Sequence, residues 1–283
     1  MEQPKQPQPT PEQLQQKHNE AVAAMLQRQL RATETVAEQL TVANRMHDDC
    51  LRFNYADRQF SFWLPNASQE PSQLSMVMSG GFRGIPEMLA MTANMKDGTI
   101  CVDVGAGVGN HTIWLAAHPK VASVYAFEPQ HTLFPVLSRN ISLNNLQDKV
   151  FAYEKALANA DIKHVNIAGI PNGTPGADSG DVLMRPAENG PYVAVTLDSL
   201  ELPRLDVLRI DVDGMQLEVL EGAEKTISKY HPVISLQMIP GPRPYAPGLF
   251  NAEHDLDKPK QLLCALEYDL RRGSPASYLA TPR

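Results

Sequence analysis

From residue 99 onward, short apolar runs of strand length alternate with stretches that have the residue pattern of helices. Strands that are buried on both faces of a sheet read as continuous apolar runs. Their alternation with helices is typical of βαβ units and of a parallel sheet between two layers of helices. We therefore predict an α/β fold with a doubly wound sheet. The predicted strands are 99–104, 122–127, 150–154, 207–210, 233–237, 268–271 and 278–281, and the predicted helices are 110–117, 131–143, 215–229 and 258–266.

The first of these strands runs directly into a glycine-rich turn. Residues 100–110 read ICVDVGAGVGN, which places three glycines between an apolar strand and a helix. Glycine is needed where a backbone turns tightly and lies against a ligand, because a Cβ atom would occupy the ligand's space. The turn therefore predicts a nucleotide-like ligand at the carboxyl end of the strand. Glycine-rich turns also occur for packing alone, so the neighbouring strand must be considered with it.

Glu128 follows the second predicted strand. A carboxylate at this position can accept hydrogen bonds from both ribose hydroxyls of an adenosine, whether in NAD or in S-adenosylmethionine. The dinucleotide fingerprint is Gly-x-Gly-x-x-Gly, whereas this turn reads Gly-x-Gly-x-Gly and has Asp103 two residues before its first glycine. An acidic residue beside the turn suits a cationic ligand without phosphate better than a pyrophosphate. The turn therefore favours S-adenosylmethionine over NAD.

Together with later motifs, these residues resemble the FkbM family of class I S-adenosylmethionine-dependent methyltransferases. The resemblance covers residues 84–237 and is most specific at IDVDG, residues 210–214, and at LEVLEGA, residues 217–223. It implies a Rossmann-like fold with a mostly parallel seven-stranded sheet. The chain departs from the family pattern at Gln237, where the family usually ends its fifth strand with glutamate.

The resemblance also implies which residues form the site. Asp211 follows the fourth strand, and we place it near the transferred methyl group and the acceptor. His111 lies just after the glycine turn, where it either acts as a base or touches the donor; packing at the start of a helix explains it equally well. No metal ligand is assigned. The residues implied to bind the donor are Asp103, Gly105, Gly107, Asn110 and Glu128, with Asn144 as a weaker candidate.

These residues predict an S-adenosylmethionine-dependent O-methyltransferase that acts on a hydroxyl of a sugar or a natural product. Asp211 or His111 would remove the hydroxyl proton, and a divalent cation held by carboxylates is left open. The alternative is a methyltransferase-fold protein that binds a ligand or assembles without turnover, which Gln237 and the long N-terminal extension favour. An NAD-dependent oxidoreductase is a third and more distant alternative.

The N-terminal part of the chain divides into three segments ahead of the methyltransferase domain, residues 99–283. Residues 1–11 are rich in Gln and Pro and are predicted to be disordered. Residues 12–50 are predicted to form an amphipathic helical extension, which either pairs two subunits as a homo-oligomer or lies on its own domain. Residues 51–98 are expected to cover one end of the sheet.

Net charge and cysteine content limit the classes of partner and cofactor that we expect. A formal net charge of -7 gives no long-range attraction to nucleic acid or to an anionic membrane, so neither is expected. Three widely spaced cysteines suggest neither a disulfide framework nor a zinc site. With no signal peptide pattern and no apolar run of bilayer length, a cytoplasmic location is expected. The expected acceptor is a small molecule or a glycan.

Overall fold

The computed structural model describes residues 37–167, 183–238, 257–274 and 277–283. The chain forms two units, Met1–Asn44 and Arg45–Arg283. Residues 37–45 are helical, so the described part of the first unit is the end of the predicted helix. The tail 1–11 and most of the predicted helix 12–50 lie outside the described residues.

Within the segment 12–50 the helix ends at residue 45, and a hairpin begins immediately after it. Strand β1 (Met46–His47) pairs with β2 (Cys50–Tyr55) across a two-residue turn. Asp48 and Asp49 form that turn with φ of 51° and 57°. Two successive residues with positive φ make the turn type that matches the twist of a hairpin, and aspartate tolerates this conformation.

The expected cover consists of a small sheet and two helices. Strand β3 (Arg58–Trp63) pairs with β2, and helices α2 (Pro71–Ser79) and α3 (Ile85–Thr92) follow. Phe60, Phe62 and Leu64 alternate in the sequence as in a strand, and all three are buried. Phe60 and Phe62 pack against Phe82, which follows α2. Strand β3 contacts helix α5 (Phe134–Leu143), and α3 contacts strands β12 (Val233–Gln237) and β13 (Tyr268–Ser274).

The main sheet has seven strands in the order β13-β14-β12-β11-β4-β5-β6. The pairings from β6 through β5, β4 and β11 to β12 are parallel, whereas β14 is antiparallel to both of its neighbours. The strand number and the dominance of parallel pairing agree with the prediction. The bounds are β4 Thr99–Val104, β5 Val121–Phe127, β6 Val150–Tyr153, β11 Val207–Ile210, β12 Val233–Gln237, β13 Tyr268–Ser274 and β14 Ser277–Pro282.

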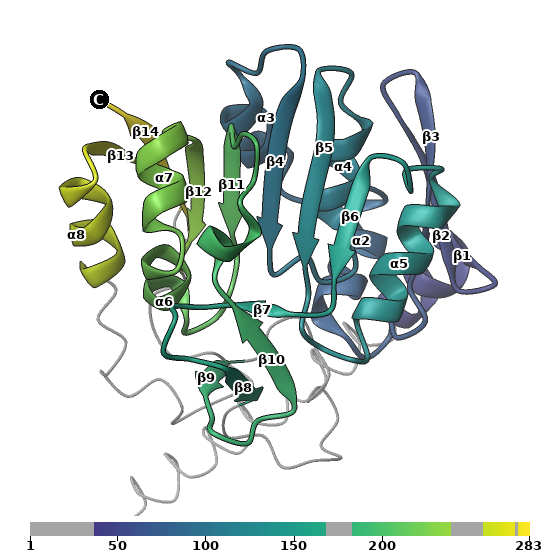
Figure 1. Cartoon of the computed structure of the whole chain (residues 1–283). Helices are drawn as coiled ribbons and strands as arrows, with labels where there is room; N and C mark the ends of the chain where they lie inside the picture. The colour runs from purple at the N-terminus through teal and green to yellow at the C-terminus, as the bar shows by residue number, and fades with distance from the viewer. Residues whose placement is uncertain (1–36, 168–182, 239–256, 275–276) are drawn as a thin grey trace, which may run out of the picture. The chain divides into compact units, whose positions relative to one another are not determined.

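Helices lie on both faces of this sheet, as expected for a doubly wound fold. In Figure 1, α7 and α8 lie on the near face, whereas α3 and α4 lie on the far face. The near layer covers a core of aliphatic side chains from β4, β11 and β12. The bounds are α4 Asn110–Ala117, α5 Phe134–Leu143, α6 Gln216–Glu221, α7 Glu224–Tyr230 and α8 Asp257–Ala265.

The single helix predicted over 215–229 is in fact two helices, α6 and α7. The break falls at Gly222, whose backbone lies so close to another segment that an added Cβ atom would be 2.0 Å from the carbonyl oxygen of Ala158. The carbonyl of Gly222 accepts a hydrogen bond from the backbone N–H of Asp198 at 3.0 Å. Contacts with distant segments therefore end α6, and periodicity along the helix alone does not reveal them.

The side chain of Asp198, in the short 3-10 helix η1 (Leu197–Leu200), caps α7 from outside the helix. Its carboxylate accepts hydrogen bonds from the backbone N–H groups of Lys225 and Thr226, at 3.2 and 2.8 Å. We expect Asp198→Ala to lower the free energy of unfolding by about 1 to 2 kcal/mol, because such caps satisfy otherwise unpaired N–H groups. Urea unfolding measures this, with Asp97→Ala, an exposed aspartate, as the control. Equal stability of the two variants would contradict the capping role.

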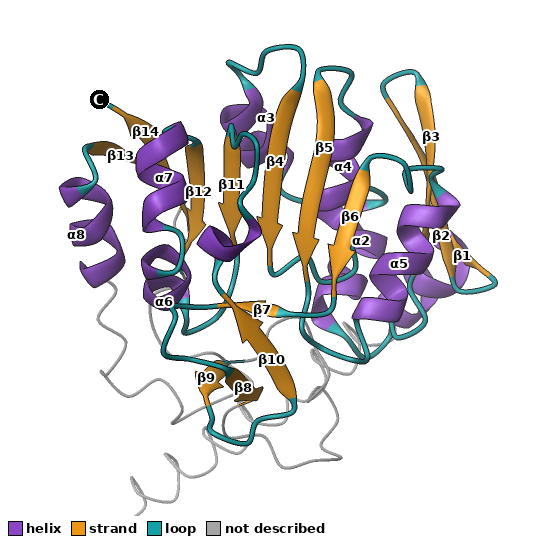
Figure 2. Cartoon of the chain, viewed as in Figure 1, coloured by secondary structure: helices purple, strands orange, loops and turns teal. Residues whose placement is uncertain are grey.

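A second, four-stranded sheet lies beyond the carboxyl ends of the parallel strands, at the bottom of Figures 1 and 2. Its order is β7-β10-β8-β9. The stretch 161–191 is rich in Gly, Pro, Asn and Asp, which predicts a hairpin or a surface loop, and the β8–β9 pair within it is a hairpin. Residues 168–182 of that stretch lie outside the described residues. The bounds are β7 Ala156–Leu157, β8 His164–Ile167, β9 Met184–Pro186 and β10 Tyr192–Val195.

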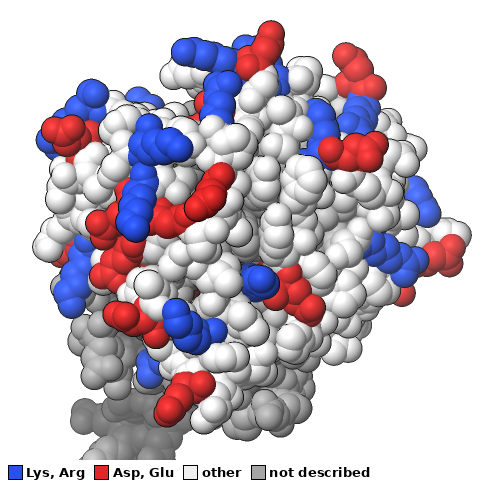
Figure 3. All heavy atoms as spheres, viewed as in Figure 1, with Lys and Arg blue, Asp and Glu red and all other residues white. Residues whose placement is uncertain are grey.

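Two surface features bear on the expected partners. On the face in Figure 3, basic and acidic side chains are interspersed, and the described residues of that face show no broad basic patch. Among the described helices, none is both long enough and apolar enough to cross a bilayer.

Candidate functional site

The glycine turn after β4 has the conformation that its sequence requires. Gly105, Gly107 and Gly109 have φ of 79°, 55° and 96°, a region that side chains disfavour. An added Cβ atom at Gly105 would lie 2.1 Å from the backbone oxygen of Asp211, so this glycine lets the turn pass against the end of β11. At Gly107, by contrast, no atom of the described residues lies within 4 Å of such a Cβ. The turn is therefore packed at its first glycine and open at its second.

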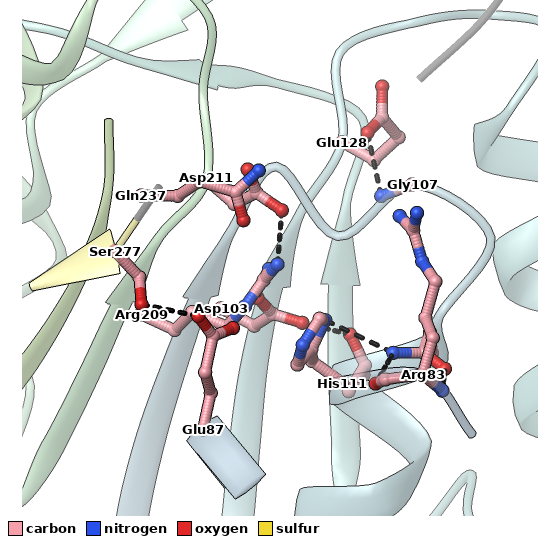
Figure 4. A network of polar contacts seen from close by, with 12 residues as sticks. Arg83, Glu87, Asp103, Gly107, His111, Glu128, Arg209, Asp211, Gln237 and Ser277 are labelled. Atoms are coloured by element: carbon pink, nitrogen blue, oxygen red, sulfur yellow. Dashed lines mark hydrogen bonds and ion pairs between the residues drawn. The ribbon is translucent and has the colours of Figure 1, made fainter. Parts of the chain in front are cut away.

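Glu128 lies directly against this turn. Its Oε2 accepts a hydrogen bond from the backbone N–H of Gly107 at 2.8 Å, and its Oε1 accepts one from Gln130 N–H at 2.9 Å (Figure 4). The residue is 3% exposed. Burial raises the pKa of Glu128 to about 7, although the two backbone hydrogen bonds oppose this shift. The first two parallel strands thus bring the glycine turn and a buried carboxyl group together, as the sequence predicted.

A buried arginine joins the two aspartates of the site. Arg209 Nη1 donates to Asp103 Oδ1 at 2.7 Å, and Arg209 Nη2 donates to Asp211 Oδ2. Burial disfavours the guanidinium charge, but Asp211 and Asp103 outweigh this effect and raise the pKa of Arg209. Asp103 has no exposed side-chain surface and also accepts a hydrogen bond from Thr112 Oγ1 at 2.6 Å. Its predicted contact with the donor stays a prediction, whereas Asp211 is 18% exposed and faces outward from this network.

Asn110, predicted to line the donor, binds the cover. Its Oδ1 accepts from the backbone N–H of Arg83 at 3.1 Å, and its Nδ2 donates to the carbonyl of Arg83 at 3.0 Å. Nδ2 also lies 3.3 Å from His111 Nδ1. Since the Arg83 contacts orient the amide with Nδ2 as donor, His111 Nδ1 is the acceptor and the ring proton lies on Nε2. The backbone of Arg83 is thus held at the start of α4.

His111 is neutral in this environment. Burial lowers its pKa well below the usual value, and the nearby positive charges of Arg209 and Arg83 lower it further. His111 and Arg209 both line a cavity of about 10 Å³, and a proton on Nε2 makes that ring atom a hydrogen-bond donor. His111 is packed at the start of α4, as one of the interpretations from sequence has it. Its role as a base or as a contact of the donor stays a prediction.

Asn144, the weaker donor candidate, holds the cover to α5. Its Oδ1 accepts from Ser61 N–H at 3.1 Å, and its Nδ2 donates to the carbonyls of Ser61 and Asn140, each at 2.7 Å. Asn140 binds the backbone of Trp63 in the same way. Both polar atoms of the Asn144 side chain therefore have partners on β3 and α5, and its donor contact stays a prediction that these bonds do not support.

Two residues from outside the motifs complete the site. Gln237 lines the small cavity beside His111, together with Glu87 of α3, whose carboxylate accepts a hydrogen bond from Ser277. A carboxylate from the cover therefore lies beside the glutamine that replaces the family's usual glutamate. Arg209 could have been found from the sequence, because a charged residue within a buried strand needs partners. The sequence gives no comparable sign for Glu87 or Arg83.

No group of three or more His, Cys, Asp or Glu residues is placed to hold a metal ion in the part of the chain that the structure describes. The divalent cation that the sequence left open therefore has no support from the described residues.

Comparison with known proteins identifies the family. Residues 103–257, more than half of the chain, match the family described as "Methyltransferase FkbM domain". The chain belongs to the FkbM methyltransferase family. A curated relative, methyltransferase sdnD of Sordaria araneosa, is 27% identical over 169 residues, which are 47% of this chain and 63% of that protein. The FkbM chain thus spans less than two thirds of the length of this relative.

Solved methyltransferase structures resemble the FkbM chain more distantly. The FkbM methyltransferase of Methylobacillus flagellatus KT is 15% identical, with a TM-score of 0.45, over 88% of this chain and 59% of that one. TYW2 of M. jannaschii, solved in complex with AdoMet, is also 15% identical, with a TM-score of 0.41, over 83% of this chain and 84% of that one.

Proposed function

We propose that this FkbM-family chain is an S-adenosylmethionine-dependent O-methyltransferase that acts on a hydroxyl of a sugar or a natural product. The observation that carries the proposal is the contact between the open glycine turn at Gly107 and the buried carboxyl group of Glu128. They meet at the carboxyl ends of adjacent parallel strands, where nucleotide-like ligands bind in open α/β sheets.

The residues present fit an adenosine-bearing donor. The open space at Gly107 would be filled by any side chain, so a ligand can lie against the bare backbone there. Each carboxylate oxygen of Glu128 uses one lone pair for a backbone N–H and keeps another for a ribose hydroxyl. When bound, S-adenosylmethionine supplies a methyl group that its sulfonium has already activated. Gly107 and Glu128 would hold its adenosine.

The acceptor side is formed by Asp211 and its neighbours. Arg209 orients the Asp211 carboxylate, and it is the one hydrogen-bond partner of that carboxylate among the described residues. Asp211 can therefore take the proton from an acceptor hydroxyl, whereas neutral His111 with its proton on Nε2 serves as a donor that orients the acceptor. Holding the acceptor oxygen and the methyl group in line lowers the activation barrier further. This contribution reaches about 7 to 11 kcal/mol for well-oriented reactants.

The proposal makes a prediction about pH, because Glu128 has a raised pKa of about 7. Ribose hydroxyls bind the ionised carboxylate, so the bound state favours loss of its proton. Affinity for S-adenosylhomocysteine, the demethylated donor, is therefore expected to rise with pH, by at most about tenfold per unit below pH 7, and to level off above pH 8. Isothermal titration at several pH values measures this.

Matched variants separate Glu128 from general effects of pH. Glu128→Gln is expected to weaken binding about 10- to 100-fold at pH 8 and to flatten the pH dependence, because the acceptor loses its charge. Glu154→Gln is the control, since Glu154 is exposed and follows the neighbouring strand β6. Absence of binding by the unmodified chain at millimolar ligand would refute the proposed function. An affinity that falls as pH rises would refute the role of Glu128. Binding of NAD instead would favour the oxidoreductase.

A further inference from the structure

Arg83 belongs to the cover but is held at the glycine turn. Both backbone polar groups of Arg83 bond to the side-chain amide of Asn110, the first residue of α4. The next residue, Gly84, has φ of 75°, and an added Cβ atom there would lie 3.3 Å from His111 Nε2. The two Asn110 hydrogen bonds thus hold Arg83 at the start of α4, immediately after the turn, and Gly84 lies close to His111.

The side chain of Arg83 extends from this anchor toward Gly107 (Figure 4). It is half-buried, and its guanidinium has no hydrogen bond or ion pair with any described residue. The other cation near His111 is Arg209, which is already bound to Asp103 and Asp211. Of the two guanidinium groups at the site, that of Arg83 is therefore the one still available to bind an anion.

We infer that Arg83 binds the carboxylate of the methionine portion of the donor. The inference rests on the proposed function. The donor carries a single carboxylate, and Glu128 and Asp211 repel that group from the two sides of the turn that they occupy. A guanidinium binds a carboxylate through two parallel hydrogen bonds, which a lysine does not reproduce. Because Asn110 ties the cover to α4 through the Arg83 backbone, the cover contributes directly to donor binding.

Two ligands that differ in this carboxylate test the inference. S-adenosylhomocysteine has it, whereas 5′-methylthioadenosine keeps the adenosine and the sulfur but lacks the amino-acid part. Arg83→Gln is expected to weaken S-adenosylhomocysteine binding about 10- to 100-fold, as for loss of a charged hydrogen-bond pair. Methylthioadenosine binding is expected to change by less than about twofold, because this ligand has no carboxylate for Arg83 to bind. Isothermal titration measures both.

Two further variants and one stability measurement complete the test. Arg83→Lys keeps the positive charge but cannot donate two parallel hydrogen bonds to a carboxylate. An intermediate loss of affinity that is confined to S-adenosylhomocysteine therefore supports the inference. Arg52→Gln, an exposed arginine of β2, is the control and should bind both ligands normally. The hydrogen bonds to Asn110 involve only the backbone of Arg83. The free energy of unfolding of Arg83→Gln, measured in urea, should therefore match that of the unmodified chain.

The failures of the two proposals are distinguishable. If the unmodified chain binds neither ligand, the proposed function fails. If it binds both, but Arg83→Gln weakens the two equally or leaves both unchanged, only the inference about Arg83 fails. A variant that unfolds more easily and loses both ligands would also overturn it, since the side chain would then act through the fold.

Discussion

Replacing Arg209 by methionine is expected to lower the free energy of unfolding by about 3 to 5 kcal/mol, the range found when one partner of a buried ion pair is removed. Methionine fills similar space but leaves the carboxylates of Asp103 and Asp211 without their cation. The effect on Asp103 is the largest, because its side chain is fully buried and, among the described residues, keeps only the Thr112 hydroxyl as a partner. The loss therefore comes mainly from an uncompensated buried charge rather than from lost packing.

Urea unfolding measures this loss, and two other variants test its cause. Arg204→Met breaks the pair with Asp206, which is partly exposed at 42% and 25%, so it should cost less than about 1 kcal/mol. Adding Asp103→Asn to Arg209→Met should recover part of the loss, because it removes the unpaired buried charge. A double variant no more stable than Arg209→Met alone, or an equal loss in Arg204→Met, would contradict this account.

The centre of the sheet could be predicted from the sequence because β4 and β11 are buried on both faces. Continuous apolar runs mark such strands without reference to their neighbours, and the bounds of β4, β11 and β12 agree with the predicted ranges. The break between α6 and α7 could not be predicted in this way. It depends on the approach of Gly222 to Ala158 and on a cap from Asp198, both of which lie far away in the sequence.

In the site, too, local sequence pattern predicts some features, whereas others depend on contacts between distant segments. The glycine turn and Glu128 belong to consecutive βαβ units, so their proximity follows from local pattern and from the rules of parallel sheets. Arg83 and Glu87 come from the cover, whose position depends on side-chain contacts such as Asn110 with the Arg83 backbone. Asn144 shows the converse. It lies within a family motif, yet its amide binds Ser61 of the cover.

Gly105 and Gly107, two of the three glycines of the turn, should lose different amounts of stability on the same substitution. Gly105→Ala is expected to lower the free energy of unfolding by about 3 kcal/mol or more, because it combines a left-handed residue with a packing overlap. Its Cβ atom would lie 2.1 Å from the backbone oxygen of Asp211, so β4 and β11 would have to separate. Gly107→Ala carries only the conformational cost, about 1 to 2 kcal/mol, since the space around it is open.

Gly107→Ala, the variant with the smaller loss of stability, should be the one that loses donor affinity while it stays folded. A methyl group at Gly107 occupies the space that we assign to the donor, so Gly107→Ala should lose about 10-fold or more in affinity for S-adenosylhomocysteine while it stays folded. Urea unfolding and isothermal titration on both variants measure the two effects separately. A stable Gly107→Ala that binds the ligand normally would show that the open side of the turn is not where the donor lies. The contact between Gly107 and Glu128 would then be a packing feature of the two strands.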